Sequence, residues 1–328
     1  MNVRRPLLSL GLDLDNLWAY MKIHGDAGWE TFPTYLDKLS PLLLDVTKRH
    51  DLKMTIFIVG QDAALEKNRE ALASLSGAGH EIGNHSFRHE PWFHLYTRAE
   101  IETEIRTAEE AIEKATGKRP IGFRGPGFSL SPDTLRVLAA RGYLYDCSTL
   151  PTFLGPLARA YYFWKAGRMS PEEKAKRSKL YGTLGDGLQP IQPYSWTVEG
   201  RTLVELPVTT MPGARVPFHL SYLLFLRRIS RPLAWTYFRT SLALCRMTGV
   251  TPSFLLHPLD LLGGDLVKEL AFFPGMDLST GAKIDFMHEI LEGLQSSYDV
   301  VTLETHARSV EAADRPGLRR AAEELALG

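Results

Sequence analysis

The sequence predicts an α/β fold in which strands alternate with helices, and it favours a (β/α) barrel over an open sheet. Short apolar runs rich in β-branched residues alternate with longer helical patterns along most of the 328 residues. The Gly-x-Gly-x-x-Gly and phosphate-loop motifs, which are typical of nucleotide-binding open sheets, are absent. Strand–helix alternation of this length implies parallel strands joined by helical crossovers.

Two helix starts support this alternation. Ser131 followed by Pro132 is an N-cap with a first-turn proline, and Thr97 with Glu100 resembles a capping box before a charged helix that ends near Gly117. The predicted strands are residues 6–14, 53–59, 81–84, 121–123, 143–146, 203–208, 253–256 and 298–303.

One segment that breaks the alternation precedes residue 200. It begins aromatic and basic, continues as a charged helix at residues 170–179, and ends in a loop rich in Gly, Pro and Gln. No internal repeat is visible, and the last residues form a charged helical pattern. We therefore predict a single barrel over residues 1–308, with insertions at about 149–200 and 212–249, and a helical tail at 309–328.

The second insertion, residues 212–249, has an unusual charge pattern. No acidic residue lies between Glu205 and Asp260, whereas six arginines do. One interpretation is two helices that cover the outer face of the barrel, with arginine stems lying over apolar surface. The other is a basic, aromatic surface that contacts a membrane or a lipid-linked substrate. The sequence leaves both open.

Composition excludes several classes of protein. Lys+Arg and Asp+Glu are balanced at 38 each, which argues against a general nucleic-acid binder. Cys147 and Cys245 are the only cysteines, so a disulfide framework and a Cys-rich zinc module are both excluded. Arg4 and Arg5 precede a short apolar run that Asp13 interrupts, which does not fit an export signal. We expect a cytoplasmic protein, with peripheral membrane contact as an option.

Residues of reactive type follow or end five of the predicted strands. In a β/α barrel the carboxyl ends of the strands form one face, so these residues are expected to converge. Taken singly, Asp146 could cap a turn and His257 could be a hydrogen-bonded core histidine, but one such explanation does not cover five strand ends. The residues are Asp13, Asp15, His85, His89, Arg124, Asp146 and His257.

The pair His85 and His89 predicts a metal site. At this spacing both imidazoles can point the same way from one helical turn, so a single cation can bind both. Zinc-type sites usually have a third protein ligand and an open position for water. The carboxylates of Asp13 and Asp15 are available at the end of the first predicted strand.

These residues resemble the motifs of the NodB-homology polysaccharide deacetylases, in order from Leu8 to about Leu303. The family consists of metal-dependent carbohydrate de-N-acetylases, some of them de-O-acetylases, on a distorted, incomplete (β/α) barrel. Asp13-Leu14-Asp15 is similar to the first motif of the Asp-x-Asp branch. The resemblance implies that Asp13 is the catalytic base and Asp15 a metal ligand.

The remaining motifs follow along the chain. His85-Ser86-Phe87-Arg88-His89 resembles the second motif and implies that its two histidines complete the ligand set for a divalent ion, most simply Zn²⁺. Arg124-Gly125-Pro126 resembles the third, whose arginine pairs with the base. Asp146 is similar to the aspartate of the fourth motif, and Leu256-His257-Pro258 to the fifth.

The resemblance implies a function for each of these groups. His257 is expected to protonate the leaving amine, the Gly127 N–H to help hold the oxyanion, and Asp146 to orient His257 or to brace Arg124. The expected activity is metal-dependent deacetylation of an N-acyl aminosugar in a polysaccharide, glycan precursor or lipid-linked sugar. The alternatives are a cyclic amide or imide hydrolase related to allantoinase and an inactive barrel that binds sugar.

Overall fold

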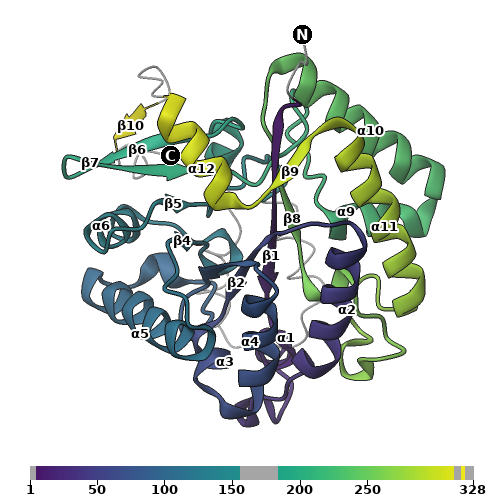
Figure 1. Cartoon of the computed structure of the whole chain (residues 1–328), viewed down its shortest axis with the longest axis horizontal. Coiled ribbons are helices and arrows are strands. Elements are labelled where there is room, and N and C mark those ends of the chain that lie inside the picture. The colour runs from purple at the N-terminus through teal and green to yellow at the C-terminus, as the bar shows by residue number, and fades with distance from the viewer. Residues whose placement is uncertain (1–4, 156–183, 314–318, 322–328) are drawn as a thin grey trace.

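A single sheet organises the part of the chain that the computed structural model describes, residues 5–155, 184–313 and 319–321 (Figure 1). The predicted helix at 170–179 lies outside these residues. The strands are β1 (Leu7–Leu14), β2 (Thr55–Ile58), β3 (Glu81–Asn84), β4 (Gly122–Phe123), β5 (Tyr145–Asp146), β6 (Tyr194–Val198), β7 (Arg201–Glu205), β8 (Ser253–Leu256), β9 (Asp299–Val301) and β10 (Arg319–Ala321). Their order is β10-β6-β7-β5-β4-β3-β2-β1-β8, and β9 pairs with β1.

Helices alternate with these strands, so the predicted α/β fold with a parallel sheet is confirmed. Every strand pairing is parallel except that of β6 with β7. The capping box of Thr97 and Glu100 begins α5, and Gly117 ends it in a left-handed conformation. The helices are α1 (Leu17–His24), α2 (Leu36–Arg49), α3 (Gly60–Ala64), α4 (Arg69–Gly77), α5 (Arg98–Thr116), α6 (Pro132–Ala140), α9 (Leu220–Ile229), α10 (Arg231–Thr248), α11 (Thr280–Ser297) and α12 (Leu303–Ala313).

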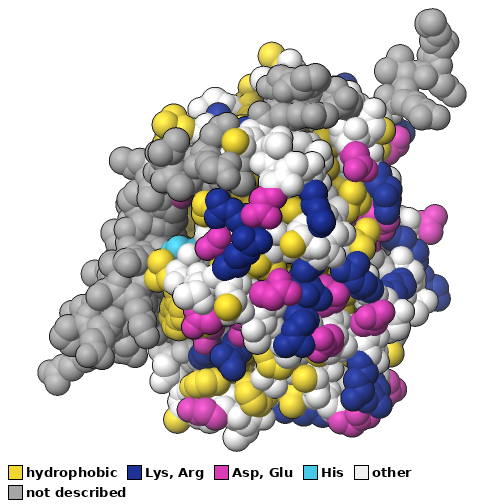
Figure 2. All heavy atoms as spheres, turned by 90° about the vertical axis from the view of Figure 1, so that its left-hand side faces the viewer, with side chains coloured by type: hydrophobic (Ala, Val, Ile, Leu, Met, Phe, Trp, Pro, Cys, Tyr) yellow, Lys and Arg dark blue, Asp and Glu magenta, His cyan; other side chains and the backbone are white. Residues whose placement is uncertain are grey.

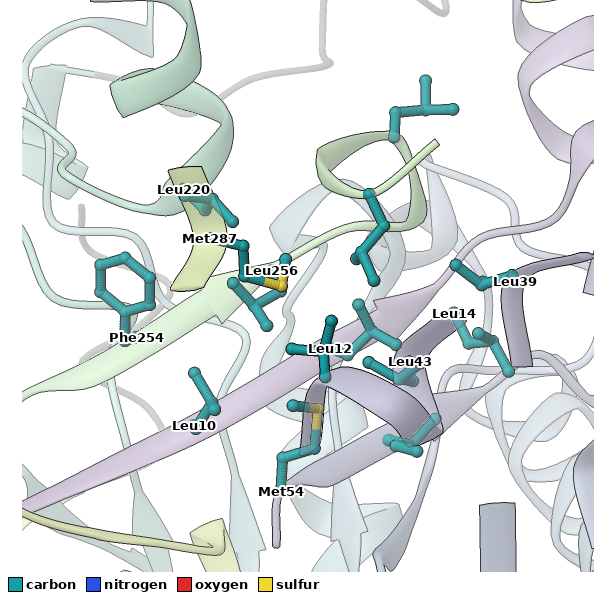
Figure 3. Packing of buried hydrophobic residues seen from close by; sticks show 14 of the residues in the cluster. Leu10, Leu12, Leu14, Leu39, Leu43, Met54, Leu220, Phe254, Leu256 and Met287 are labelled. Atoms are coloured by element: carbon teal, nitrogen blue, oxygen red, sulfur yellow. The ribbon is translucent and has the colours of Figure 1, made fainter. Parts of the chain in front are cut away.

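Strand β1 separates two environments because its side chains alternate between the faces of the sheet. Leu10, Leu12 and Leu14 are buried in the main apolar cluster (Figure 3). Leu43 of α2 and Met287 of α11 belong to the same cluster, so this face of β1 is covered by helices. The face is entirely apolar, which leaves the polar residues of β1 for the opposite face.

The opposite face holds a smaller apolar cluster and the first polar groups of the site. A side chain at Gly11 would meet Leu303 of α12, Arg124 and Phe57 within 3.5 Å. Phe57 and Leu303 pack there with Tyr145 in a separate buried cluster. Helix α12 therefore fills the inner face of the sheet, and it runs across the predicted domain boundary at residue 308.

Two of these strands, β6 and β10, were not predicted from the sequence. Strand β6 lies in the first predicted insertion and forms an antiparallel hairpin with β7. Glu199 and Gly200 join the two strands, both with positive φ (47° and 79°), as a two-residue hairpin turn requires. Residues 319–321 form β10 and pair with β6, so the predicted helical tail does not extend through them.

The second insertion contains two helices, α9 and α10, as the first of its two interpretations has it. Ser230 caps α10 through Leu233 N, and Gly249 ends that helix in a left-handed conformation. Leu223 and Leu224 of α9 are buried in the main cluster, so this helix belongs to the core as well as to the surface. None of the helices in the described residues is both long and apolar enough to cross a membrane.

Charges of both signs are mixed on the face that carries α5 and α6 (Figure 2). Arg141 reaches Glu102 at 2.6 Å and Glu109 at 3.1 Å, and Arg119 reaches Glu109 at 2.9 Å. These pairs tie the two helices together. A surface of this kind presents no continuous basic patch, in keeping with the balanced charge of the chain.

Candidate active site

Asp15, His85 and His89 converge at the carboxyl ends of β1 and β3. The Asp15 Oδ1 atom lies 2.9 Å from His89 Nε2 and 3.4 Å from His85 Nε2. One ligand atom from each of the three residues lies within 4.8 Å of the others. Both histidines are buried, and the Asp15 side chain is 14% exposed. The structure therefore brings together the three residues expected to hold a metal ion.

The two histidines lie on an irregular loop and not on the helical turn that their spacing suggested. Ser86 and His89 have positive φ values of 60° and 53°, which a right-handed helix does not allow. Glu104 of α5 holds the loop by accepting hydrogen bonds from Phe87 N at 3.1 Å and Arg88 N at 2.9 Å. The convergence of the imidazoles thus depends on a distant helix, and the helical expectation was wrong.

Hydrogen bonding also fixes how His85 presents its ring. Its Nδ1 lies 2.6 Å from the carbonyl oxygen of Arg124. A carbonyl only accepts, so Nδ1 carries a hydrogen, and Nε2 is the ring atom that faces Asp15 and is available to a metal ion. Burial alone would raise the pKa of Asp15, but His89 and His85 outweigh it and hold that pKa well below its usual value.

The three residues fit a divalent metal ion. Two imidazoles and one carboxylate form a common zinc ligand set that leaves positions open for water or substrate. Metal-binding histidines almost always donate their second ring N–H to a carboxylate, carbonyl or water, as His85 does. Buried Asp15 Oδ1 makes no further hydrogen bond within the described residues, as suits an atom reserved for a cation.

Beside this cluster lies a buried ion pair between Arg124 and Asp13. Arg124 Nη1 donates to Asp13 Oδ1 at 2.6 Å, and Nε donates to Cys147 O at 3.2 Å. The guanidinium lies over the Phe57 ring, 4.5 Å from its centroid. Burial would lower the pKa of Arg124, but Asp13 more than compensates and raises it. The Arg124 guanidinium is therefore a permanent positive charge next to the Asp13 carboxylate.

His257 joins the same edge of the sheet from the other side of β1. Leu256 pairs with Leu12, so the residues that follow them, His257 and Asp13, leave neighbouring strands side by side. The His257 side chain is 23% exposed, which gives solutes access to its ring.

Comparison with known proteins identifies this arrangement. Residues 25–145, which include His85, His89 and Arg124, match the family model for polysaccharide deacetylase. This part of the chain is a polysaccharide deacetylase domain by that match. It is 28% identical over 151 residues to a peptidoglycan deacetylase of Helicobacter pylori, covering 44% of this chain and 50% of that protein. It is 32% identical over 110 residues to the Bacillus subtilis peptidoglycan-N-acetylmuramic acid deacetylase PdaA, covering 33% and 41%.

The chain thus spans half or less of these two curated relatives of the deacetylase family. Its homologues are hydrolases that cleave amide C–N bonds in non-peptide substrates. A Mycobacterium smegmatis structure assigned to the polysaccharide deacetylases covers 95% of this chain, and 93% of its own chain is covered. Its TM-score is 0.63 at 19% identity, so the likeness supports the fold.

Asp146 makes no hydrogen bond or ion pair with His257 or with the Arg124 side chain among the described residues. Its carboxylate accepts from Ser148 N at 3.0 Å and from the Ser148 hydroxyl at 2.7 Å. That hydroxyl in turn accepts from Gly125 N at 2.8 Å. Burial, followed by the nearby Glu205, raises the pKa of Asp146 well above its usual value. Asp146 therefore supports the turn after Arg124, and the expected orientation of His257 is not seen.

Gly127 lies in a short 3-10 turn, Pro126–Phe128, just beyond Arg124. It is exposed and has a φ of 58°, and its N–H makes no hydrogen bond within the described residues. The turn requires Gly125 more strictly, because a side chain there would lie 2.0 Å from Ser129 O. The oxyanion function of Gly127 stays a prediction.

The hydrogen bonds that hold the chain around Asp15 were not predicted from the sequence. Asp62, in α3, accepts hydrogen bonds from Asn16 Nδ2 at 2.7 Å and Trp18 Nε1 at 3.0 Å, while Tyr35 OH donates to Asp15 O. Burial raises the pKa of Asp62 to about 7. One signal was available: Asp62 follows the second predicted strand, as the other site residues follow theirs.

Proposed function

We propose that this protein is a metal-dependent amide hydrolase that deacetylates an N-acyl aminosugar in a polysaccharide, glycan precursor or lipid-linked sugar. The observation that carries the proposal is the joint placement of Asp15, His85 and His89 beside the Asp13–Arg124 pair. The match of residues 25–145 to the polysaccharide deacetylase family model supports the same reaction class. The named activities of the curated relatives, on peptidoglycan and chitin, support an aminosugar substrate.

Asp15, His85 and His89 would hold a divalent ion, most simply Zn²⁺. When bound, the ion supplies a water of lowered pKa and polarises the amide carbonyl. The protein's contribution is the fixed ring of His85, held through Arg124 O, and the carboxylate of Asp15, whose ion-pair partners among the described residues are the two histidines.

Asp13 and His257 divide the proton transfers. The Asp13 carboxylate takes a proton from the attacking water, and Arg124 orients that carboxylate through its hydrogen bond. The His257 imidazolium gives a proton to the departing amine as the C–N bond breaks, so acetate and a free aminosugar result. Gly127 N–H is the proposed donor to the oxyanion.

The ligand set gives a direct test. His85→Ala is expected to bind less than the one equivalent of Zn²⁺ that the wild type takes up after chelator treatment, and to lose acetate release from N-acetylglucosamine oligomers. The matched control is His50→Ala, because His50 lies at the end of α2 and bonds to His288 and Gln295. A His85→Ala variant that keeps stoichiometric metal would overturn the ligand set, and active apoprotein would overturn metal dependence.

We also propose that α9 and α10 contact a membrane surface, whereas the cytoplasmic location expected from the sequence stays a prediction. Three apolar side chains are exposed near the turn between these helices: Phe225 (47%), Ile229 (66%) and Leu233 (46%). No acidic residue lies between Glu205 and Asp260 in the sequence, and the carboxylates that reach this turn, Asp277 and Glu289, are paired with Arg228 and Arg231. Apolar side chains beside arginines are typical of interfacial helices.

Sedimentation with phosphatidylglycerol-containing vesicles at low salt tests this contact. The wild type is expected to sediment with the vesicles, and the triple variant Phe225→Ser, Ile229→Ser and Leu233→Ser to remain in solution. The triple variant should keep acetate release from a soluble oligomer. Equal sedimentation of the two proteins, or no sedimentation of the wild type, contradicts the proposed surface.

A further inference from the structure

Helix α9 supplies a side chain to the site as well as covering the sheet. Ser221, the second residue of α9, places its hydroxyl oxygen 3.0 Å from His257 Nδ1. The hydroxyl is thus within hydrogen-bond distance of the ring expected to act as the acid. Leu220 and Leu223, on either side of Ser221, are fully buried in the main cluster, which fixes this end of the helix.

Asp260 lies behind the same hydroxyl. Its Oδ2 accepts from His257 N at 2.8 Å but is 3.9 Å from His257 Nδ1, which is too far for a hydrogen bond. The Ser221 hydroxyl lies near the Asp260 carboxyl and lowers its pKa. Asp260 is only 2% exposed, so water has little access to this contact. The carboxylate therefore reaches the imidazole through Ser221.

The direction of the hydrogen bonds follows from the groups themselves. Burial raises the pKa of Asp260, and His257, Ser221 and Lys283 offset only part of that rise. The Asp260 Oδ2 atom is nevertheless an acceptor in this structure, because His257 N donates to it. A carboxylate only accepts, so Ser221 donates its hydrogen to Asp260 and its oxygen accepts from His257 Nδ1–H. Asp260 N donates to His257 O at 2.9 Å and also faces the His257 side chain in a capping box.

We propose that Ser221 is a positioning residue that, together with Asp260, holds His257 in the tautomer with its hydrogen on Nδ1. This inference rests on the proposed function for its catalytic meaning. It assigns the proton transfer to Nε2, which makes no hydrogen bond within the described residues. The imidazolium gives its Nε2 proton to the leaving amine. The neutral ring that remains keeps the hydrogen on Nδ1, which donates to the Ser221 oxygen.

A second histidine packs against this ring without adding charge. His219 lies edge-on to His257, with ring centroids 5.9 Å apart and an interplanar angle of 70°. Burial, followed by the nearby His257, lowers the pKa of His219 to about 3. His219 is therefore uncharged near neutral pH, and it contacts the His257 ring by packing.

Nitrogen-15 NMR of histidine-labelled, metal-free protein at alkaline pH tests the tautomer independently of turnover. The His257 signals, assigned by their loss in His257→Gln, are expected to show hydrogen on Nδ1 in the wild type and in Ser221→Thr. Ser221→Ala is expected to shift them toward the Nε2–H form. A wild-type ring with its hydrogen on Nε2, or an unchanged ring in Ser221→Ala, overturns the proposal.

Kinetics give the second readout. Ser221→Ala is expected to lower kcat about tenfold to hundredfold, with KM unchanged. This is the range found when a group that orients a metal-binding histidine is removed. Ser221→Thr should restore most of kcat. The control is Ser241→Ala, a buried serine of α10 whose hydroxyl donates to Tyr237 O. Equal kcat loss in both alanine variants would make Ser221 merely structural. If the wild type itself has no turnover, the proposed function fails while the NMR result still decides the tautomer.

Discussion

Asp13→Asn is expected to lower kcat by about 10²–10⁴-fold, the usual contribution of a positioned general base. Asparagine keeps the size of the side chain and an oxygen that can accept from Arg124 Nη1, which now lies 2.6 Å from Asp13 Oδ1. It cannot take up the proton of the attacking water. The metal ligands are untouched, so Zn²⁺ binding should stay at the wild-type level while acetate release falls.

The matched control for this variant is Asp45→Asn, because Asp45 is an exposed carboxylate on α2. It should release acetate at the wild-type rate. Circular dichroism establishes that both proteins are folded at the assay temperature. An Asp13→Asn protein that binds Zn²⁺ normally and keeps full activity would show that another group is the base.

Arg124→Met is expected to lower the free energy of unfolding by about 3–5 kcal/mol, the cost of leaving one partner of a buried ion pair unpaired. Arg124 is fully buried and Asp13 only 5% exposed, so water cannot replace the lost partner. Methionine retains much of the apolar contact with Phe57, over which the guanidinium lies. The loss should therefore report mainly on the unpaired Asp13 carboxylate.

Urea denaturation measures this effect, and a double variant isolates its cause. Arg124→Met combined with Asp13→Asn removes both charges and should recover part of the stability lost in Arg124→Met alone. The control is Arg106→Met, because Arg106 pairs with Glu110 at 2.8 Å on the exposed surface of α5, where such pairs contribute about 0.3–0.5 kcal/mol. If Arg124→Met were no more destabilising than Arg106→Met, the buried pair would not matter to folding.

Strand ends explain why much of the site could be predicted from sequence. Asp13, Asp15, His85 and Arg124 come at or just after the ends of parallel strands, and parallel strands end at one edge of a sheet. The same rule misled at Asp146, whose carboxylate turns to Ser148, because a strand end does not tell which neighbour its side chain will meet.

Features that depend on distant contacts could not be predicted in this way. The loop of His85 and His89 takes its shape from Glu104 on α5 and from the carbonyl of Arg124, neither of which their spacing reveals. Strand β10 has three residues and exists through its pairing with β6. Ser221 came from a segment interpreted from its overall charge, where one hydroxyl carries no signal.

The three partners of β1 also determine when the site can form during synthesis. Ser9 pairs with Ser253 of β8 and with Val301 of β9, so most of the chain must leave the ribosome before β1 is fully paired. Contacts so far apart in sequence carry a large loop-closure cost and slow folding. One edge of β1 therefore stays unpaired for much of translation, and His257, which follows β8, joins Asp13 and Asp15 late.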